Sequence, residues 1–284
     1  MSGVANISEQ HTIKIIISHD VDHLFRDDHY RDLIYPKLWG RETLAALHLR
    51  GKISFNEWRG RLAGTFRKER HHIRELSRFD KSNGVEATYY FGMANGLGMS
   101  YKKEKALDII NELINEDIPV GIHGIDYQNY EKMSQEYNDF VLLTGKKPDG
   151  IRMHYVRFDD DTFKKLSEIG YLYDTTKFYK KKCSCIEKPY RVGGMWEFPL
   201  CVMDGYLSSD LEKSKEETLR YLYTAEEIKL PYFTVLFHDY QFTEEYKTPF
   251  EWYKWFVNYC NAKGYEFIDY RNAVKELNCK YGYE

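Results

Sequence analysis

The sequence predicts a single parallel α/β domain over residues 1–284, and at this length a closed or nearly closed barrel fits the pattern. Short apolar segments rich in β-branched residues alternate at least six times with amphipathic helical segments, which is typical of parallel strands joined by crossover helices. No linker, internal repeat or low-complexity stretch interrupts the alternation. The 284 residues, 43% of them hydrophobic, are enough for one large core.

The elements follow from local apolar spacing and from turn residues. Strands are predicted near residues 13–17, 86–91, 119–122, 150–155, 171–175, 196–200, 232–237 and 266–268. Helices are predicted near residues 102–115, 130–143, 160–169, 211–228, 250–262 and 272–277, and a long polar, mostly helical insertion is predicted at 24–84. The glycine-rich residues 92–100 fit neither a dinucleotide-binding nor a P-loop pattern, so we interpret them as a turn.

Composition narrows the class of protein. The formal net charge is -3, which argues against a nucleic-acid partner held by bulk electrostatics. Residues 1–10 are polar and no apolar run approaches the roughly 20 residues of a membrane span. The five cysteines are odd in number and contain no CxxC pair. They indicate reduced structural thiols, and we expect a cytoplasmic protein without a transmembrane segment.

The segment His19-Asp-Val-Asp-His23 directly follows the first apolar strand. Asp20 and Asp22 lie two positions apart, so an extended backbone points both carboxylates to the same side, where they repel each other. A bound cation or a shared proton would relieve the repulsion. The alternative is a polar loop in which an aspartate caps the next helix.

Other polar residues fall at the predicted carboxyl ends of later strands. They are His123, Arg152, His154, Asp174 and His238. In a parallel barrel these ends gather on one face, which is where active sites lie. Separately, each residue has a structural alternative: a satisfied histidine in a polar core, or an arginine in a buried ion pair.

The ordered motifs HDVD, VGIH, RMHY and LFH resemble those of the polysaccharide deacetylases, the NodB-like carbohydrate esterases of family four. The resemblance implies a distorted (β/α) barrel of about seven parallel strands. It also implies that Asp20 is the general base, that Asp22 binds a divalent metal ion and that Arg152 orients the base. A backbone amide near Tyr155 would hold the oxyanion. His238 would be the general acid, with Asp174 or Asp239 behind it.

The sequence departs from this family's second motif, which has two histidines four residues apart. Here His123 is followed at that spacing by Tyr127. The replacement ligand is His154 or Asp126. We favour His154 because the chain is similar to a divergent HDVDH branch in which an RxHYxRF segment supplies this histidine. The Gly-Pro that usually follows the first motif is also missing.

These residues point to a metal-dependent hydrolase, with zinc as the favoured ion. We expect removal of an N-acyl group, most simply acetyl, from an amino sugar in bacterial surface polysaccharide biosynthesis. We expect that a phosphate on a nucleotide- or lipid-linked sugar binds to residues 180–182 (all lysine) and Arg191. The alternatives are a deformylase or another C–N hydrolase on the same scaffold, and a catalytically silent barrel that binds glycans.

Overall fold

The computed structural model describes residues 13–29, 34–37, 39–40, 53–179 and 186–283. These residues form a curled sheet of ten strands in the order β6-β7-β5-β4-β3-β2-β1-β9-β8, with β10 also paired to β1. The strands are β1 (Lys14–Val21), β2 (Thr88–Phe91), β3 (Val120–Gly124), β4 (Ile151–Met153), β5 (Tyr173–Asp174), β6 (Tyr190–Val192), β7 (Met195–Glu197), β8 (Val202–Met203), β9 (Tyr232–Leu236) and β10 (Glu266–Phe267). All neighbouring pairs are parallel except β6 with β7.

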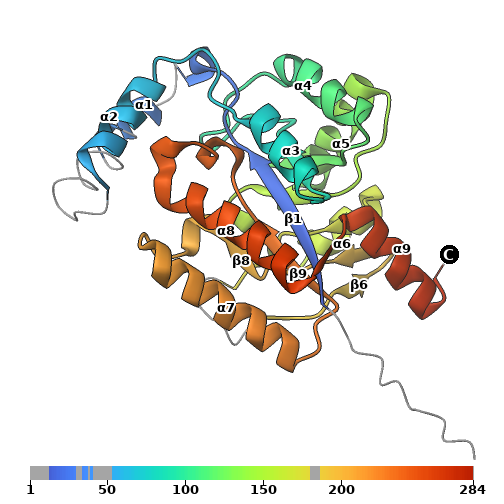
Figure 1. The fold of residues 1–284 in the computed structure, drawn as a ribbon. Coiled ribbons are helices and arrows are strands. Elements are labelled where there is room, and N and C mark those ends of the chain that lie inside the picture. The colour runs from blue at the N-terminus through green and yellow to red at the C-terminus, as the bar shows by residue number, and fades with distance from the viewer. Residues whose placement is uncertain (1–12, 30–33, 38, 41–52, 180–185, 284) are drawn as a thin grey trace, which may run out of the picture.

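Most of the helices cover the outside of the sheet, and β1 runs through the middle of the molecule (Figure 1). The described α-helices are α1 (Ile34–Lys37), α2 (Phe55–Gly64), α3 (Ile73–Ser82), α4 (Lys103–Asn115), α5 (Tyr130–Thr144), α6 (Thr162–Ile169), α7 (Leu211–Glu227), α8 (Lys247–Lys263) and α9 (Tyr270–Tyr281). In Figure 1, α1 and α2 lie at one side of the carboxyl end of β1, where α2 packs against the short helical segment that leads into α8. None of the described helices is long and apolar enough to cross a bilayer.

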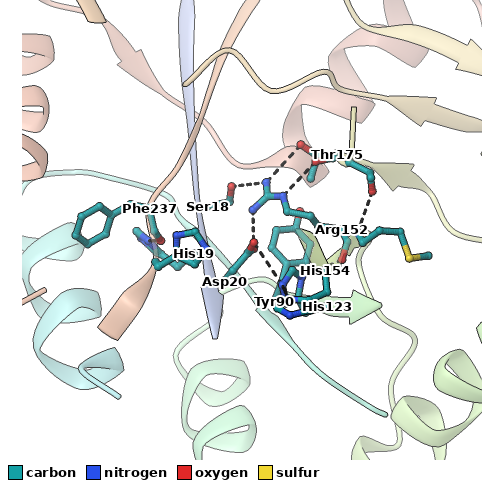
Figure 2. A network of polar contacts seen from close by, with 12 residues as sticks. Ser18, His19, Asp20, Tyr90, His123, Arg152, His154, Thr175 and Phe237 are labelled. Carbon is teal, nitrogen blue, oxygen red and sulfur yellow. Dashed lines mark hydrogen bonds and ion pairs between the residues drawn. The ribbon is translucent and has the colours of Figure 1, made fainter. Parts of the chain in front are cut away.

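The period of two along β1 divides its side chains between two faces. Ile15 and Ile17 belong to the large apolar core beneath the helices, whereas Ile16 belongs to a second core on the concave face of the sheet. Continuing the same alternation places Ser18 and Asp20 on the concave face, and His19 on the outer face. Figure 2 accordingly shows His19 on the opposite side of β1 from Asp20.

Helix α9 supplies part of the concave core. Its Tyr270 is fully buried and stacks on Tyr173 of β5, with 4.7 Å between the ring centroids. Tyr173 in turn receives a 3.2 Å hydrogen bond from the hydroxyl of Tyr90 in β2. Aromatic side chains therefore fill this interior as a packed core rather than leaving an open channel.

The predicted fold class is confirmed, with more and shorter strands than the roughly seven expected. Residues 195–203 explain part of the difference: they run along β5 as β7 and then along β9 as β8. An isolated parallel bridge between Phe178 and Leu200 brings the two ends of the curled sheet together. The domain limits, 1–284 with an insertion at 24–84, stay a prediction because parts of both ranges lie outside the described residues.

A buried polar network ties α3 to the sheet. Asp80 is 3% exposed, and its carboxylate accepts hydrogen bonds from Tyr253 of α8 at 2.5 Å and from Tyr89 of β2 at 3.3 Å. The His19 ring lies between this carboxylate, 3.0 Å from Nε2, and the Phe237 carbonyl oxygen, 2.9 Å from Nδ1. Because both partners of the ring are acceptors, the first histidine of the HDVDH motif has a structural role.

Asp80→Ala should destabilise the protein by about 3 kcal/mol, because it leaves three buried polar groups without the acceptor that they share. The measurement is urea-induced unfolding. Glu75→Ala is the matched control on the same helix: Glu75 is exposed, and its loss should change stability by less than about 0.5 kcal/mol. A similar small loss in both variants would contradict the role given to the network.

Candidate active site

The concave face carries polar side chains at the carboxyl ends of β4, β3, β1 and β9, which are four of five consecutive strands in the sheet. Asp20 lies near the end of β1, His123 in β3, Arg152 in β4, and His238 two residues after β9. The alternation of side chains along each strand directs all four of these residues to the concave side of the sheet. Their neighbours Ile122, Ile151 and Val235 accordingly belong to the core on the outer side. The sheet therefore brings together residues that are up to 218 positions apart in the sequence.

Asp22, His123 and His154 form a cluster whose ligand atoms lie within 4.8 Å of one another. Oδ1 of Asp22 is 3.4 Å from Nε2 of His123 and 3.4 Å from Nδ1 of His154. The two ring nitrogens are 3.0 Å apart. The cluster contains the three residues expected to hold the metal ion, including His154 as the third ligand.

The donor set fits a divalent cation. Asp22 Oδ1 is buried and has no hydrogen-bond partner within the described residues. His123 uses its other nitrogen, Nδ1, on the carbonyl oxygen of Arg152 at 3.0 Å, which leaves the Nε2 lone pair directed at the cluster. Burial opposes ionisation of Asp22, but the adjacent imidazoles of His123 and His154 outweigh it and hold its pKa well below its usual range. One carboxylate and two imidazoles are ligands that suit zinc and similar ions.

Asp126, the alternative third ligand, lies outside this cluster. Its carboxylate accepts hydrogen bonds from the backbone of Gln128 and Asn129 and forms an ion pair with Lys132 at 3.1 Å. It thus organises the loop that leads into α5.

Asp20 and Arg152 form a fully buried ion pair. Nη1 of Arg152 lies 2.7 Å from Oδ1 of Asp20, and the other carboxylate oxygen is 3.6 Å from Nε2 of His123. Burial alone would raise the pKa of Asp20. The charge of Arg152 is the strongest of the opposing effects, and the pKa ends below its usual value. Figure 2 shows the guanidinium between Asp20, Ser18 and Thr175.

The carboxylate behind His238 is Asp204, so the expectation of Asp174 or Asp239 is wrong on this point. Nδ1 of His238 lies 2.7 Å from Asp204 Oδ1, and its backbone N–H donates to Oδ2 at 2.7 Å. Burial would lower the pKa of His238, but Asp204 and then Asp22 raise it to about 10. The opposite ring nitrogen, Nε2, is 3.8 Å from Asp22 Oδ2.

Sheet order explains the error. Asp174 belongs to β5, which is five strands away from β9, whereas Asp204 follows β8, the direct neighbour of β9. Asp174 instead accepts hydrogen bonds from Thr176. Asp239 turns away and accepts the backbone N–H of His72.

A cavity of about 530 Å³ opens above these residues. It is lined by Asp20, Asp22, His123, His154 and His238, and by the tyrosines Tyr155, Tyr206, Tyr240 and Tyr246. Tyrosine rings beside polar groups suit an amphipathic ligand such as a sugar.

A tight turn follows β4 and carries His154 into the cavity. Tyr155 and Val156 both have left-handed backbone angles, φ 60° and 49°, which are costly for a bulky or β-branched residue. Tyr155 is held there by a hydrogen bond from its hydroxyl to the carbonyl oxygen of Leu97 at 3.0 Å. The predicted strand 150–155 therefore ends at Met153.

The basic residues expected at the pocket rim are not part of the described cavity wall. Residues 180–182 lie outside the described residues. The Arg191 guanidinium packs 3.9 Å from the ring centroid of Tyr283 and hydrogen-bonds to Gly193. The cavity instead contains two other cationic residues, Lys37 and Arg70.

Comparison of the structure with solved structures identifies the fold. A protein described as a polysaccharide deacetylase from Mycobacterium smegmatis superimposes with a TM-score of 0.63 at 13% identity, covering 98% of this chain and 94% of its own. A second from Pseudomonas aeruginosa PAO1 gives 0.62 at 13% identity, with coverages of 96% and 94%. The chain has the polysaccharide deacetylase fold.

The same fold also occurs in a protein with a different activity. Puue allantoinase superimposes with a TM-score of 0.64 at 13% identity, covering 100% of this chain and 96% of its own. No family model and no curated protein sequence matches the chain. The resemblance inferred from the motifs is thus confirmed at the level of the polysaccharide deacetylase fold.

Sequence reasoning missed Asp204, Lys37 and Arg70. Asp204 follows the apolar pair Val202–Met203, which repeats the pattern of a strand ending in an aspartate. Two residues are too few to identify a strand from periodicity. Nothing in the local sequence of Lys37 or Arg70 distinguishes them from the other cations of the insertion.

His154→Ala should abolish stoichiometric zinc binding, whereas Asp126→Ala should leave it intact, because only His154 contributes to the cluster. Removing one of three protein ligands typically costs more than the roughly 10- to 100-fold loss seen for outer-shell residues. The measurement is metal content by elemental analysis after dialysis against a defined zinc buffer. Metal retained by the His154 variant and lost by the Asp126 variant would reverse the assignment.

Proposed function

We propose that the protein is a metal-dependent amide hydrolase that removes an N-acyl group, most simply acetyl, from an amino sugar. One observation carries the proposal. An Asp-His-His cluster, an arginine-paired aspartate and an aspartate-paired histidine meet in a single tyrosine-lined cavity. That combination supplies a metal site, a base and an acid for C–N hydrolysis. The descriptions of two similar structures as polysaccharide deacetylases add support.

The residues that would hold the ion are Asp22, His123 and His154. A divalent cation such as zinc, bound there, would supply Lewis-acid chemistry to the acyl carbonyl. The carbonyl of Arg152, which engages His123 Nδ1, would keep that ring in the orientation needed for binding.

Asp20 is suited to the role of general base. Its carboxylate is kept ionised by Arg152 and held in one orientation by the 2.7 Å contact. An ionised, fixed carboxylate can accept the proton of an attacking water. A backbone amide near Tyr155 would donate to the oxygen that becomes negative in the transition state.

His238 is suited to the role of general acid. Asp204 holds Nδ1, so the other nitrogen is the one directed toward the cluster. The raised pKa keeps the ring protonated near neutral pH, and Nε2 can pass its proton to the departing amine.

A second candidate function is hydrolysis of a different C–N bond, such as that of a formamide or a cyclic amide. The likeness to an allantoinase supports it, because one fold hosts both activities. A catalytically silent glycan-binding barrel is the remaining alternative. Surface polysaccharide biosynthesis and a cytoplasmic location stay predictions.

The deciding experiment combines metal analysis with product release. Purified, zinc-loaded protein is incubated with N-acetyl and N-formyl amino sugars and with allantoin, and acetate, formate and amine are quantified. Acetate release that a chelator stops and zinc restores supports the proposal. Turnover of allantoin alone supports the second candidate. Stoichiometric zinc without turnover of any of these compounds would favour a silent barrel.

Asp20→Asn and Asp22→Asn should separate catalysis from metal binding. The Asp20 variant should lose roughly 100-fold or more in kcat while keeping stoichiometric zinc, because it removes a proton acceptor and not a ligand. The Asp22 variant should lose both. Equal zinc loss in the two variants, measured by elemental analysis beside the kinetics, would refute the division of roles.

Asp204→Asn should shift the alkaline limb of the pH–kcat profile to lower pH. The acid works only while His238 is protonated, so activity falls as the pH rises through its pKa. The charge of Asp204 is the largest effect that raises the pKa of His238. Removing that charge lowers the pKa, so activity falls at a lower pH. Asp174→Asn is the comparison, since Asp174 does not contact His238. An unchanged alkaline limb in the Asp204 variant would exclude His238 as the titrating acid.

A further inference from the structure

Two cationic side chains line the cavity without an assigned partner. Arg70 is half-buried and Lys37 is exposed, and both contribute to the cavity wall. Within the described part of the chain, neither side chain makes a hydrogen bond or an ion pair. A half-buried arginine has normally found a carboxylate partner, because its desolvation is otherwise uncompensated.

The backbone fixes Arg70 beside the motif that supplies the metal ligand. Its N–H donates to the carbonyl oxygen of Leu24 at 2.8 Å, and the N–H of Arg26 donates to Lys68 at 3.0 Å. An antiparallel bridge between Phe25 and Glu69 joins the same two segments. Arg70 is therefore attached to the chain immediately after Asp22 and His23, rather than carried on a separate part of the insertion.

The acidic group near Arg70 is already engaged by other arginines. Glu245 forms an ion pair with Arg67 at 2.5 Å, and its backbone oxygen accepts a hydrogen bond from Arg61. The charge of Arg70 also lowers the pKa of Glu245, but by less than the charge of Arg67 does. Counting only the described residues, this side of the cavity therefore has an excess of positive charge.

The carboxylates on the cavity floor do not offset that excess. Asp20 is paired with Arg152, and Asp22 is directed at His123 and His154. Both are committed to the proposed chemistry. Among the described residues no carboxylate is left to pair with Arg70, which leaves its counter-charge to a bound molecule.

We propose that Arg70, assisted by Lys37, binds an anionic group of the substrate. The substrate class is then an N-acylated sugar that carries a carboxylate or a phosphate at some distance from the acyl group. The inference rests on the proposed function, because it takes the acyl group to lie at the Asp22–His123–His154 cluster of the same cavity. A guanidinium matches the two oxygens of either anion through paired hydrogen bonds.

Tyr240 and Tyr246 fit this arrangement. Both line the cavity, and their rings meet edge to face with centroids 5.3 Å apart. They offer an apolar wall for the sugar ring, next to the cationic side. The anion site thus differs from the one expected from sequence, since it uses the helical insertion in place of residues 180–182 and Arg191.

The test measures binding separately from turnover. Chelator-treated full-length chain is titrated calorimetrically with N-acetylglucosamine, N-acetylglucosamine 1-phosphate and an N-acetylated aminouronic acid. Wild type should bind at least one charged sugar roughly 10- to 100-fold more tightly than the neutral sugar. Whether the phosphate or the carboxylate gains more identifies the anion.

Variants at Arg70 locate the effect. Arg70→Ala should bind charged and neutral sugars equally. Arg70→Lys should keep part of the preference for charged sugars, because lysine retains the positive charge but lacks the paired donors of the guanidinium. Arg59→Ala is the matched control: Arg59 is an exposed cation of α2 that does not line the cavity. It should behave as wild type, which separates a local contact from a change in net charge.

The outcomes separate this inference from the proposed function. Acyl release from N-acyl sugars, with no dependence of binding on Arg70 or on substrate charge, would overturn the anion site alone. Charge-dependent binding through Arg70, with no acyl release from any sugar by the zinc-loaded chain, would overturn the hydrolase proposal and leave the anion site standing.

Discussion

The buried guanidinium of Arg152 is the interaction on which the site depends. It donates to Asp20 and to Ser18 at 2.7 Å each and to the Thr175 carbonyl oxygen at 3.1 Å. Its central carbon, Cζ, lies 4.6 Å from the ring centroid of Tyr90. A fully buried charge is tolerated only when its donors are satisfied in this way. The same residue's carbonyl orients His123, so a single strand position controls both the aspartate and one histidine of the cluster.

The arrangement also connects the site to the core below it. Tyr90 and Tyr270, which surround Arg152, belong to the aromatic core on the concave face. The polar layer at the strand ends therefore rests on a rigid aromatic layer. A site supported on a packed interior holds its geometry without help from loops.

Much of this could be predicted from the sequence because strand periodicity is a local property. The alternation along residues 13–22 predicts that Asp20 and Asp22 share a side, and the strand-end rule brings them near His123, Arg152, His154 and His238. Sheet order is not local. Asp174 and Asp204 both follow short apolar segments, and only the order of β5, β8 and β9 decides which of them reaches His238. Strand β6 was missed for another reason: its three residues are too few to show a periodicity, whereas β7 overlaps the strand predicted at 196–200.

The pairing of β1 with the last strands has a consequence for how the protein is made. Lys14 pairs with Tyr232 of β9 and with Glu266 of β10, and its side chain reaches Glu266 across 252 positions of sequence. At roughly 5–20 residues per second, β1 waits about 10–50 s of synthesis for its partner. During that interval the isoleucine-rich strand has an unpaired edge, which is a template for association between nascent chains. The edge of the strand that carries Asp20 therefore stays open to such association until most of the chain has been synthesised.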